Sequence, residues 1–390
     1  MRVTHFIRRI WTNDGGSNRA VLDMALYQAR AGCEVAVAAF DDRDIPHPWR
    51  ACGPGVPRVV RLDRPLRRAV GLLPRAQVDG LLSRTDVLHF HDLWEPGQVA
   101  LARAARRHAK PYILTPHGML NDWSVRQKRF KKFLYTRLFG ARLLAGASFI
   151  HLTARAELEQ SQRRHPRTPG TVIPLIFDLD PYRAEPDPAP ARRGLPLPSP
   201  DRPSILYLSR LHEKKRPDLV IRAAAGLRRM GLDFHVVIAG PGAPDYRAGL
   251  EQLVRDLSLS DHVRFLGMVP EELKPSLFAA CDLFVLPTQM ENFGFVYFES
   301  LACGTPLVTT RGTDTWRELQ DTGAARIVGD PATTPDELAG AIAPLIADRP
   351  ALRAMGRSGR RWVLDHLEPS RVVPQFVSMY QRAIDPLCRP

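Results

Sequence analysis

Short runs rich in β-branched residues alternate with longer stretches of helical periodicity, and this alternation constrains the fold most strongly. A strand, helix, strand order predicts parallel sheets whose strands are joined by right-handed crossover helices. In the first half of the chain the expected strands are 3–7, 34–40, 87–90, 112–115 and 149–152, and the expected helices are 17–31, 96–108 and 128–144. No stretch approaches the ~18 uninterrupted apolar residues of a transmembrane helix.

The alternation stops between Asp178 and Pro203, where eight prolines occur. Because proline at this density disfavours both helices and sheet ladders, we expect a linker here. Beyond it the alternation resumes, with expected strands at 204–208, 234–239, 263–266, 283–286 and 307–309 and expected helices at 218–230, 247–257, 295–302 and 372–384.

We therefore predict an α/β chain with two doubly wound, Rossmann-like domains. The predicted divisions are a first domain at 1–180, a Pro-rich linker at 181–202, a second domain at 203–368 and a C-terminal helix at 369–390. Ligands of doubly wound folds bind at the carboxyl ends of the parallel strands. With two such domains, the expected site is a cleft across which they face each other.

The net charge is confined to the first half of the sequence. The 390 residues carry 55 Lys and Arg against 41 Asp and Glu, a formal charge of +14. Residues 1–198 contain 32 basic and 18 acidic residues, whereas the remainder contains 23 of each. This asymmetry indicates an anionic partner for the first half. Because only seven of the basic residues are Lys, a compositional preference for Arg is the alternative explanation.

Two features favour a cytoplasmic protein. The five cysteines are scattered without a CxxC pair, which fits a reducing compartment. The N-terminus turns polar at Arg8 and Arg9, so we expect it to form a first strand and not a signal peptide.

Two candidate sites lie in the first predicted domain. Residues 13–17 (Asn-Asp-Gly-Gly-Ser) follow the first strand, where Gly15 and Gly16 would let the backbone approach an anion at a helix N-terminus. Since GxGxxG is absent, an ordinary tight turn is the alternative. His117, followed by Gly118, ends another strand and would exchange hydrogen bonds with a ligand, unless it is a structural histidine.

A pair of histidines raises the question of a metal. His89 and His91 lie two residues apart on one expected strand, so both imidazoles should lie on the same face. No third ligand has a recognisable spacing. We therefore expect no metal.

Two further candidates lie in the second predicted domain. Arg210 and Lys215 follow its first strand, where Arg210 would bind a phosphate in a bidentate manner and Lys215 would add a point charge. A solvated basic turn is the alternative. In the strongest candidate, residues 291–299, Glu291 and Glu299 bracket an amide-rich turn. Ionised carboxylates accept hydrogen bonds from hydroxyls, so this pair suits a polyhydroxyl ligand, although two incidental glutamates on a helix are the alternative.

In this order, the segments resemble the nucleotide-sugar glycosyltransferases of the GT-B fold, specifically the large retaining family 4. The resemblance covers most of the chain. It rests on the Glu-x7-Glu segment with its internal Phe-Gly, on Arg210 and Lys215, on Gly15 and Gly16, on His117 and Gly118, and on the run 302–306. Residues 116–120 and 310–316 are similar to members that build bacterial exopolysaccharide or lipopolysaccharide.

The resemblance implies roles residue by residue. Arg210 and Lys215 would hold the donor diphosphate, and Glu299 would bind the ribose hydroxyls. Glu291 would contact hydroxyls of the transferred sugar. The remaining implied contacts are donor-binding amides around Asn292, Phe293, Gly294 and Phe295, His117 beside the donor sugar, and amides of Gly15 and Gly16 at the reaction centre.

One segment departs from the family pattern. Where the family often has Pro-Asn-Gly-x-Asp, residues 174–178 read Pro-Leu-Ile-Phe-Asp. The Asn-Gly turn is absent, so we expect the loop on the donor side to differ.

The expected activity is that of a retaining hexosyltransferase without metal or cofactor. It would move a sugar from a UDP-, GDP- or ADP-sugar to a glycan or polyprenyl-linked acceptor in bacterial cell-surface polysaccharide biosynthesis. Arg210, Lys215, Glu291 and His117 are the expected catalytic residues, with the two cations stabilising the leaving diphosphate. No residue stands out as the carboxylate nucleophile of retaining glycosidases, so we expect front-face attack by the acceptor hydroxyl.

Two other functions stay open. A sugar-nucleotide epimerase on the same fold would cleave the donor without an acceptor. A basic nucleic-acid-binding protein would explain the charge, but the sequence has no helix-turn-helix, zinc or RNP-type signature, so we expect no nucleic-acid partner.

The resemblance assigns the acceptor, and with it the positive charge, to the first domain. Residues from Arg126 to Arg142 interleave cations with large apolar residues there. Such a helix is typical of one that lies on an anionic leaflet, which predicts peripheral association with the inner face of the plasma membrane. The alternative is an ordinary amphipathic helix packed on its own sheet.

Overall fold

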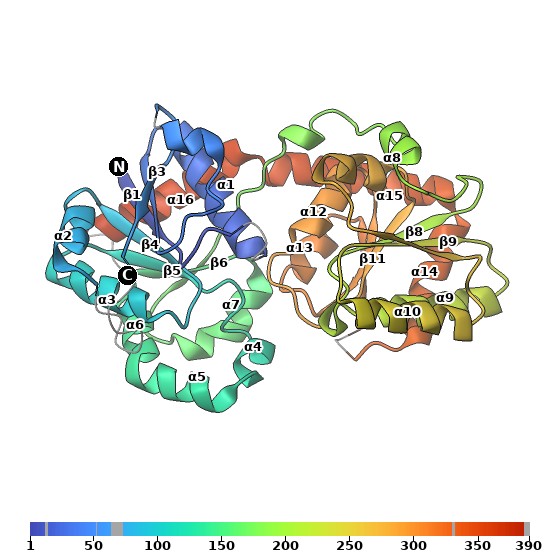
Figure 1. Ribbon diagram of the computed structural model, residues 1–390, viewed down its shortest axis with the longest axis horizontal. Coiled ribbons are helices and arrows are strands. Elements are labelled where there is room, and N and C mark those ends of the chain that lie inside the picture. The colour runs from blue at the N-terminus through green and yellow to red at the C-terminus, as the bar shows by residue number, and fades with distance from the viewer. Residues whose placement is uncertain (12–14, 52, 64–72, 330–331, 386–390) are drawn as a thin grey trace. The chain divides into compact units, whose positions relative to one another are not determined.

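The chain folds into two compact units, drawn in Figure 1 from a computed structural model. The first unit contains residues 1–178 and 367–390, and the second contains residues 179–366. The structure describes residues 1–11, 15–51, 53–63, 73–329 and 332–385. Asn13 and Asp14, which belong to the first candidate site, lie outside the described residues.

The first unit is built on seven parallel strands in the order β3-β2-β1-β4-β5-β6-β7. Its elements are β1 (Arg2–Phe6), α1 (Gly16–Arg30), β2 (Glu34–Ala39), η2 (His47–Ala51), β3 (Arg58–Arg61), α2 (Arg75–Ser83), β4 (Val87–His91), α3 (Pro96–Arg107), β5 (Tyr112–Thr115), α4 (Asp122–Arg126), α5 (Arg129–Tyr135), η3 (Thr136–Gly140), α6 (Ala141–Ala145), β6 (Phe149–Leu152), α7 (Arg155–Ser161), η4 (Gln162–Arg164), β7 (Gly170–Val172) and α16 (Pro369–Ile384).

The second unit is built on six parallel strands in the order β10-β9-β8-β11-β12-β13. Its elements are η5 (Asp180–Tyr182), α8 (Ala189–Gly194), β8 (Ser204–Leu208), η6 (Glu213–Lys215), α9 (Pro217–Arg229), β9 (His235–Ala239), α10 (Pro244–Asp256), β10 (Val263–Gly267), η7 (Glu271–Leu273), α11 (Lys274–Ala279), β11 (Leu283–Leu286), α12 (Phe295–Ala302), β12 (Leu307–Thr310), α13 (Trp316–Asp321), β13 (Ala325–Val328), α14 (Pro335–Ala347) and α15 (Arg349–His366).

Every strand expected from the sequence is present, with its ends displaced by at most one residue. The strand order in each unit reverses direction once, after β1 in the first and after β8 in the second, which is the doubly wound topology. The predicted α/β class with two Rossmann-like sheets is therefore confirmed.

Both faces of the first sheet are covered by helices, as a buried parallel sheet requires. One face packs Phe6, Phe90 and Leu114 against α2, α3 and α6. The opposite face packs Val35 and Val37 against α1. The last helix, α16, also contacts α1, β4 and β5, so the C-terminal end of the chain returns to the first unit (Figure 1).

The Pro-rich segment is more ordered than a linker. It contains η5 and α8, and Ala191 of α8 is fully buried. The Ala191 amide donates to Ser276 Oγ at 2.8 Å, and Arg192 donates to the carbonyl of Ala280, so α8 is fastened to α11. The prediction that prolines exclude a helix here was wrong because Pro190 stands in the first turn of α8, where a proline removes no intrahelical hydrogen bond.

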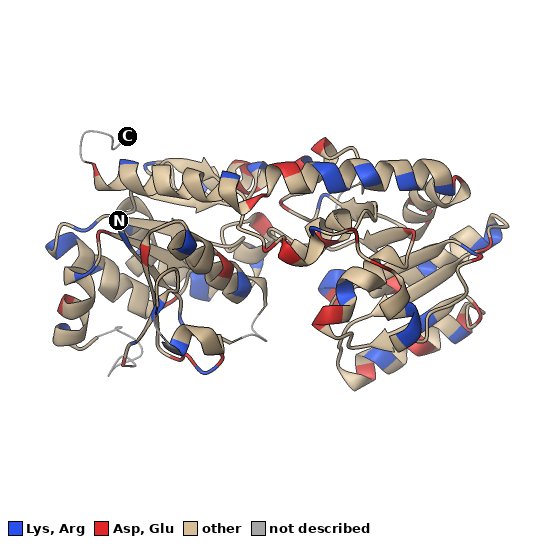
Figure 2. Ribbon diagram, turned by 90° about the horizontal axis from the view of Figure 1, so that it is seen from above, with Lys and Arg blue, Asp and Glu red and all other residues tan. Residues whose placement is uncertain are grey.

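The charge asymmetry sharpens when it is counted by unit. The first unit carries 32 Lys and Arg against 17 Asp and Glu, and the second carries 23 against 24. Acidic and basic residues are interspersed over the second unit (Figure 2). The positive charge is thus a property of the first unit alone.

Candidate active site

Three loops meet at the carboxyl edge of the second sheet, after the adjacent strands β8, β11 and β12. The Gln289 amide donates to the carbonyl of Lys214 at 2.8 Å. The Glu291 amide donates to the carbonyl of Gly312 at 2.8 Å, and the Asp314 amide donates to the carbonyl of Glu291 at 2.9 Å. Segments far apart in the sequence are therefore held together by their backbones.

An ion pair between the Lys215 ammonium and the Glu291 carboxylate crosses this junction. Lys215 is only 8% exposed, whereas Arg210 nearby is exposed. Burial, Lys214 and Arg210 together lower the pKa of Lys215 to about 7. Burial and Arg210 also lower the pKa of Lys214, which Asp314 partly opposes. The three cations thus lie close enough for the charges on both lysines to be disfavoured, an arrangement that suits a dianionic ligand such as a diphosphate.

The turn after Glu291 is fixed by side chains and by one glycine. Asn292 Nδ2 donates to Asp314 Oδ2 at 3.1 Å, and Thr315 Oγ1 donates to the Phe293 carbonyl at 3.0 Å. Gly294 has a φ of 67°, in the left-handed region, and α12 begins at the next residue. The positive end of the α12 dipole therefore lies beside the ion pair.

The structure brings most of the residues predicted in the second domain together. Arg210, Lys215, Glu291 and Asn292 share the junction, and Phe293 and Gly294 form the turn into α12. Phe295 is the first residue of α12 and is buried. Glu299 lies within α12 and is 3% exposed.

Sequence reasoning missed three residues of this site. Lys214, Asp314 and Gly312 take part in the hydrogen bonds and charges described above. Gly312 is required by close approach, since a Cβ there would lie 2.1 Å from the Thr288 carbonyl oxygen. Gly312 and Asp314 lie in the run 310–316, whose similarity to one group of relatives was the available signal for them.

The first unit has a separate set of candidate residues at the carboxyl edge of its own sheet. Gly15 has a φ of 102°, which favours glycine, and α1 begins at Gly16. His117 has a φ of 47°, and the Gly118 amide donates to the buried Glu157 carboxylate at 2.7 Å. A non-glycine residue held in the left-handed region at a strand end is typical of functional sites.

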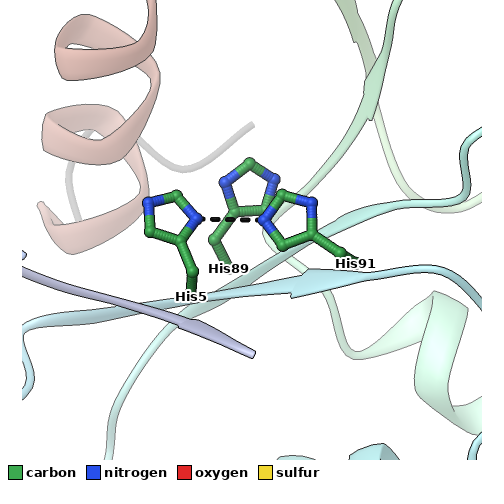
Figure 3. A group of neighbouring side chains, drawn as sticks. All are labelled: His5, His89 and His91. Carbon is green, nitrogen blue, oxygen red and sulfur yellow. Dashed lines mark hydrogen bonds between the residues drawn. The ribbon is translucent and has the colours of Figure 1, made fainter. Parts of the chain in front are cut away.

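His117 heads a cluster of buried histidines. Its Nε2 lies 3.1 Å from His91 Nδ1, and His91 Nε2 lies 3.0 Å from His5 Nδ1. Figure 3 shows the rings of His5, His89 and His91 side by side. Their nitrogens lie within 4.8 Å of one another. The third histidine, His5, comes from the neighbouring strand β1, which is why no spacing in the sequence indicated it.

Two family models match the chain. "Glycosyl transferase 4-like domain" covers residues 15–175, and "Glycosyl transferases group 1" covers residues 194–362. The D-inositol 3-phosphate glycosyltransferase of Mycolicibacterium paratuberculosis is 30% identical over an alignment of 372 positions, which covers 88% of this chain and 80% of that relative. The chain belongs to the family 4 nucleotide-sugar glycosyltransferases of the GT-B fold.

Other members of the glycosyltransferases agree with this assignment. The GDP-mannose-dependent alpha-(1-6)-phosphatidylinositol monomannoside mannosyltransferase of Mycolicibacterium smegmatis is 34% identical over 201 residues, 50% of this chain. The match spans 51% of that relative's length. The crystal structure of Anabaena Alr3699/HepE in complex with UDP and glucose superposes with a TM-score of 0.74 at 20% identity, covering 98% of this chain and 99% of that one. That likeness concerns the fold, which is the predicted GT-B fold.

Replacing Gly294 tests how far the site depends on close backbone approach. A Cβ at Gly294 would lie 2.5 Å from the Tyr297 ring and 3.0 Å from Glu291 Cγ, with a left-handed backbone. We expect Gly294→Ala to lower the free energy of unfolding by roughly 2–4 kcal/mol in urea titrations. Gly304→Ala is the control, because its φ is 77° but none of the described atoms lies within 4 Å of its Cβ, so only about 1 kcal/mol is expected. Equal losses would contradict the role of crowding.

The lowered pKa of Lys215 predicts a pH dependence of ligand binding. Lys215 is protonated below its pKa of about 7 and loses its charge above it, while the diphosphate of a nucleotide sugar stays ionised. Affinity for UDP-glucose or GDP-mannose, measured by calorimetry, should therefore fall roughly 5- to 30-fold between pH 6.5 and 8.5. Lys215→Arg keeps a permanent charge and should flatten the profile. A flat profile in the unmodified protein would show that Lys215 does not contact the ligand.

Proposed function

We propose that this glycosyltransferase transfers a hexose from a nucleoside diphosphate sugar to a lipid-linked glycan during the synthesis of bacterial cell-surface polysaccharide. The observation that carries the proposal is the cluster of Arg210, Lys214 and Lys215 beside Glu291. Cations at the carboxyl edge of a doubly wound sheet suit a diphosphate, and a carboxylate beside them suits sugar hydroxyls. UDP, GDP and ADP all carry the diphosphate that the cluster would bind.

One of two relatives supports a membrane-bound acceptor. One relative is named for a phosphatidylinositol mannoside and another for inositol 3-phosphate. The first acceptor is a membrane lipid, whereas inositol 3-phosphate is a small water-soluble molecule, and both offer hydroxyl groups. A hydroxyl of a lipid-linked glycan has the same chemistry.

We propose retention by front-face attack, without metal or cofactor. The bond between the anomeric carbon and the β-phosphate oxygen breaks, and the acceptor oxygen bonds to the same face of that carbon. The acceptor proton passes to the leaving phosphate oxygen. Arg210 and Lys215, with the positive end of α12, would stabilise the charge that develops on the diphosphate.

The remaining residues would orient the sugar. Glu291 and the amides from Asn292 to Phe295 would bind its hydroxyls, and Glu299 would bind the ribose. His117, Gly15 and Gly16 of the first unit would contact the donor sugar and the reacting atoms.

A panel of donors with variants of Arg210 tests this proposal. With the active donor and a lipid extract, we expect Arg210→Ala to lower kcat/KM by about 10²–10³-fold, and Arg210→Lys by less, because Lys keeps the charge but not the bidentate geometry. Arg264→Ala removes an exposed Arg from β10 and should leave turnover unchanged. Unchanged turnover in Arg210→Ala and Lys215→Ala would contradict the phosphate assignment. Epimerised donor without transfer would favour the epimerase instead.

We further propose that the first unit docks on an anionic membrane through a basic apolar surface on α4, α5 and η3. Its apolar members are exposed, with Phe130 at 78% and Phe133 at 62%. They are Trp123, Phe130, Phe133, Leu134 and Leu138. The exposed cations among them are Arg126, Lys128, Arg129, Lys131, Arg137 and Arg142, and no Asp or Glu occurs between 123 and 156.

The inner side of this surface packs partly against the first unit. The two predictions for this segment, a helix that lies on a membrane and an amphipathic helix that packs on its own sheet, therefore describe its outer and inner faces. Tyr135 and Phe139 pack against the core of the first unit, whereas α5 buries none of its residues fully. None of the described helices is long and apolar enough to span a bilayer. The one acid on these helices, Asp122, is paired with Arg164 at 2.6 Å. Exposed apolar residues interleaved with cations therefore favour an anionic interface over a protein of mixed charge.

Co-sedimentation with vesicles tests the basic apolar surface. We expect binding to vesicles that contain phosphatidylglycerol and little binding to phosphatidylcholine alone. The double variant Phe130→Ser/Phe133→Ser keeps every charge but should weaken binding by roughly tenfold or more. Met268→Ser removes a comparably exposed apolar side chain from the second unit and should bind normally. Equal binding to both kinds of vesicle would contradict the proposal.

A further inference from the structure

A continuous chain of hydrogen bonds runs from His117 through the interior of the first unit. It passes between the sheet and the helices α1 and α16, where side chains from four strands (β1, β4, β5 and β6) and two helices meet. Burial is the main cause that lowers the pKa of His117 to about 3 and of His5 and His151 to about 4, and it also lowers those of His89 and His91. Each imidazole is therefore neutral at pH 7 and carries one proton.

The far end of the chain fixes the direction of its first half. The Ile173 carbonyl can only accept, so His151 Nε2, 2.8 Å away, carries a proton and His151 Nδ1 does not. Thr115 Oγ1 must then donate to His151 Nδ1 at 2.7 Å and accept from His89 Nε2 at 2.6 Å. His89 Nδ1 is left with a lone pair, which accepts from the Tyr380 hydroxyl at 2.8 Å.

The same direction continues through the second half. The Tyr380 oxygen accepts from Gln28 Nε2 at 3.0 Å, and Gln28 Oε1 accepts from His5 Nε2 at 2.8 Å. His5 Nδ1 then accepts from His91 Nε2 at 3.0 Å, and His91 Nδ1 accepts from His117 Nε2 at 3.1 Å. Every donor in the chain finds an acceptor.

If every hydrogen bond in this chain ran in the opposite direction, the arrangement would fail at one point only. If Gln28 were turned over, each histidine could take the other tautomer, but His151 Nε2 would then direct a lone pair at the Ile173 carbonyl. Two acceptors would face each other in a fully buried place. The carbonyl of Ile173 therefore sets the proton position on His117, through Tyr380 of the last helix.

We propose that this chain holds His117 in the tautomer with its proton on Nε2, so that the lone pair on Nδ1 accepts a hydrogen bond from a hydroxyl of the substrate sugar. The proposal rests on the function proposed above, in which His117 contacts the sugar. His117 is only partly buried, and none of the described residues bonds to its Nδ1. Tyr380, His5, His89 and His91 act through His117 and are positioning residues.

The hydrogen bonds also disfavour binding of a metal by His5, His89 and His91. Their six ring nitrogens are all used: His5 bonds to Gln28, His89 to Tyr380 and Thr115, and His91 to His5 and His117. A metal would have to displace these bonds.

The isosteric variant Tyr380→Phe cuts the chain between Gln28 and His89. We expect ¹⁵N spectra of histidine-labelled protein to show one His117 tautomer, unprotonated at Nδ1, in the unmodified protein and a mixture in Tyr380→Phe. Tyr112→Phe is the matched control, because Tyr112 is also buried in the first unit and its hydroxyl donates to the Leu143 carbonyl outside the chain. It should keep the single tautomer. A proton on Nδ1 in the unmodified protein would overturn the proposal, as would loss of the imidazole N–H signals on adding Zn²⁺.

Kinetics then test the use of the lone pair. If about half of the molecules hold the wrong tautomer, kcat of Tyr380→Phe should fall about twofold while KM for the donor changes little, and Tyr112→Phe should match the unmodified protein. Unchanged kcat in Tyr380→Phe despite mixed tautomers would overturn the contact with the sugar. The spectra need no substrate, so absence of transfer with every donor would count against the proposed function and not against the tautomer.

Donors with a fluorinated sugar test the same contact through substrate specificity. Replacing the sugar hydroxyl that faces His117 with fluorine removes a donor but keeps an acceptor. The unmodified enzyme should discriminate against one deoxyfluoro donor strongly, and Tyr380→Phe should discriminate less, because part of its His117 carries a proton on Nδ1. Equal discrimination by the two proteins would contradict the assignment.

Discussion

The ion pair between Lys215 and Glu291 is the interaction on which the second unit's site depends. It joins two loops whose partners are 76 residues apart, and both charges are largely removed from water. Removing one partner of such a pair leaves an uncompensated charge and typically costs about 3–5 kcal/mol. Burial lowers the pKa of Lys215, and repulsion from the nearby cations Lys214 and Arg210 lowers it further. An arriving diphosphate would relieve this repulsion, which couples the order of the site to its ligand.

The first unit also buries polar side chains, and its buried histidines are neutral. Its sheet buries His5, His89, His91 and His151 and partly buries His117, and none of the four could be buried as a free cation without a large cost in free energy. In the hydrogen-bond chain each ring nitrogen that lies inside the unit has a partner. Two of these partners are Gln28 from α1 and Tyr380 from α16. This gives a physical reason for the last helix to return to the first unit, where its phenolic hydroxyl completes the chain.

The sequence was sufficient for ten of the thirteen strands in the described residues and for the charged residues that follow them, because both are local patterns. It missed the short strands β3, β7 and β13, which lie at the edges of the sheets. Periodicity placed these ten strands within one residue of their ends. Arg210, Lys215 and Glu291 lie in the loops that follow two of them. The partners of these residues depend on strand order and register, which periodicity does not contain. His5 meets His89 because β1 pairs with β4 in a register that places these two residues opposite each other. Tyr380 lies 291 residues from its partner His89, and no spacing rule connects them.

Hydrogen exchange measured with and without a saturating nucleotide sugar tests the central claim most directly, since it reports where the donor binds without requiring the acceptor. Backbone amides that are held by the three joined loops should gain protection, above all Lys215, Gln289, Glu291 and Asp314. Protection should be absent at the far edge of the same sheet, on β10 and α10. Unchanged exchange in the three loops, with protection elsewhere in the described chain, would contradict the assignment of the donor to this site.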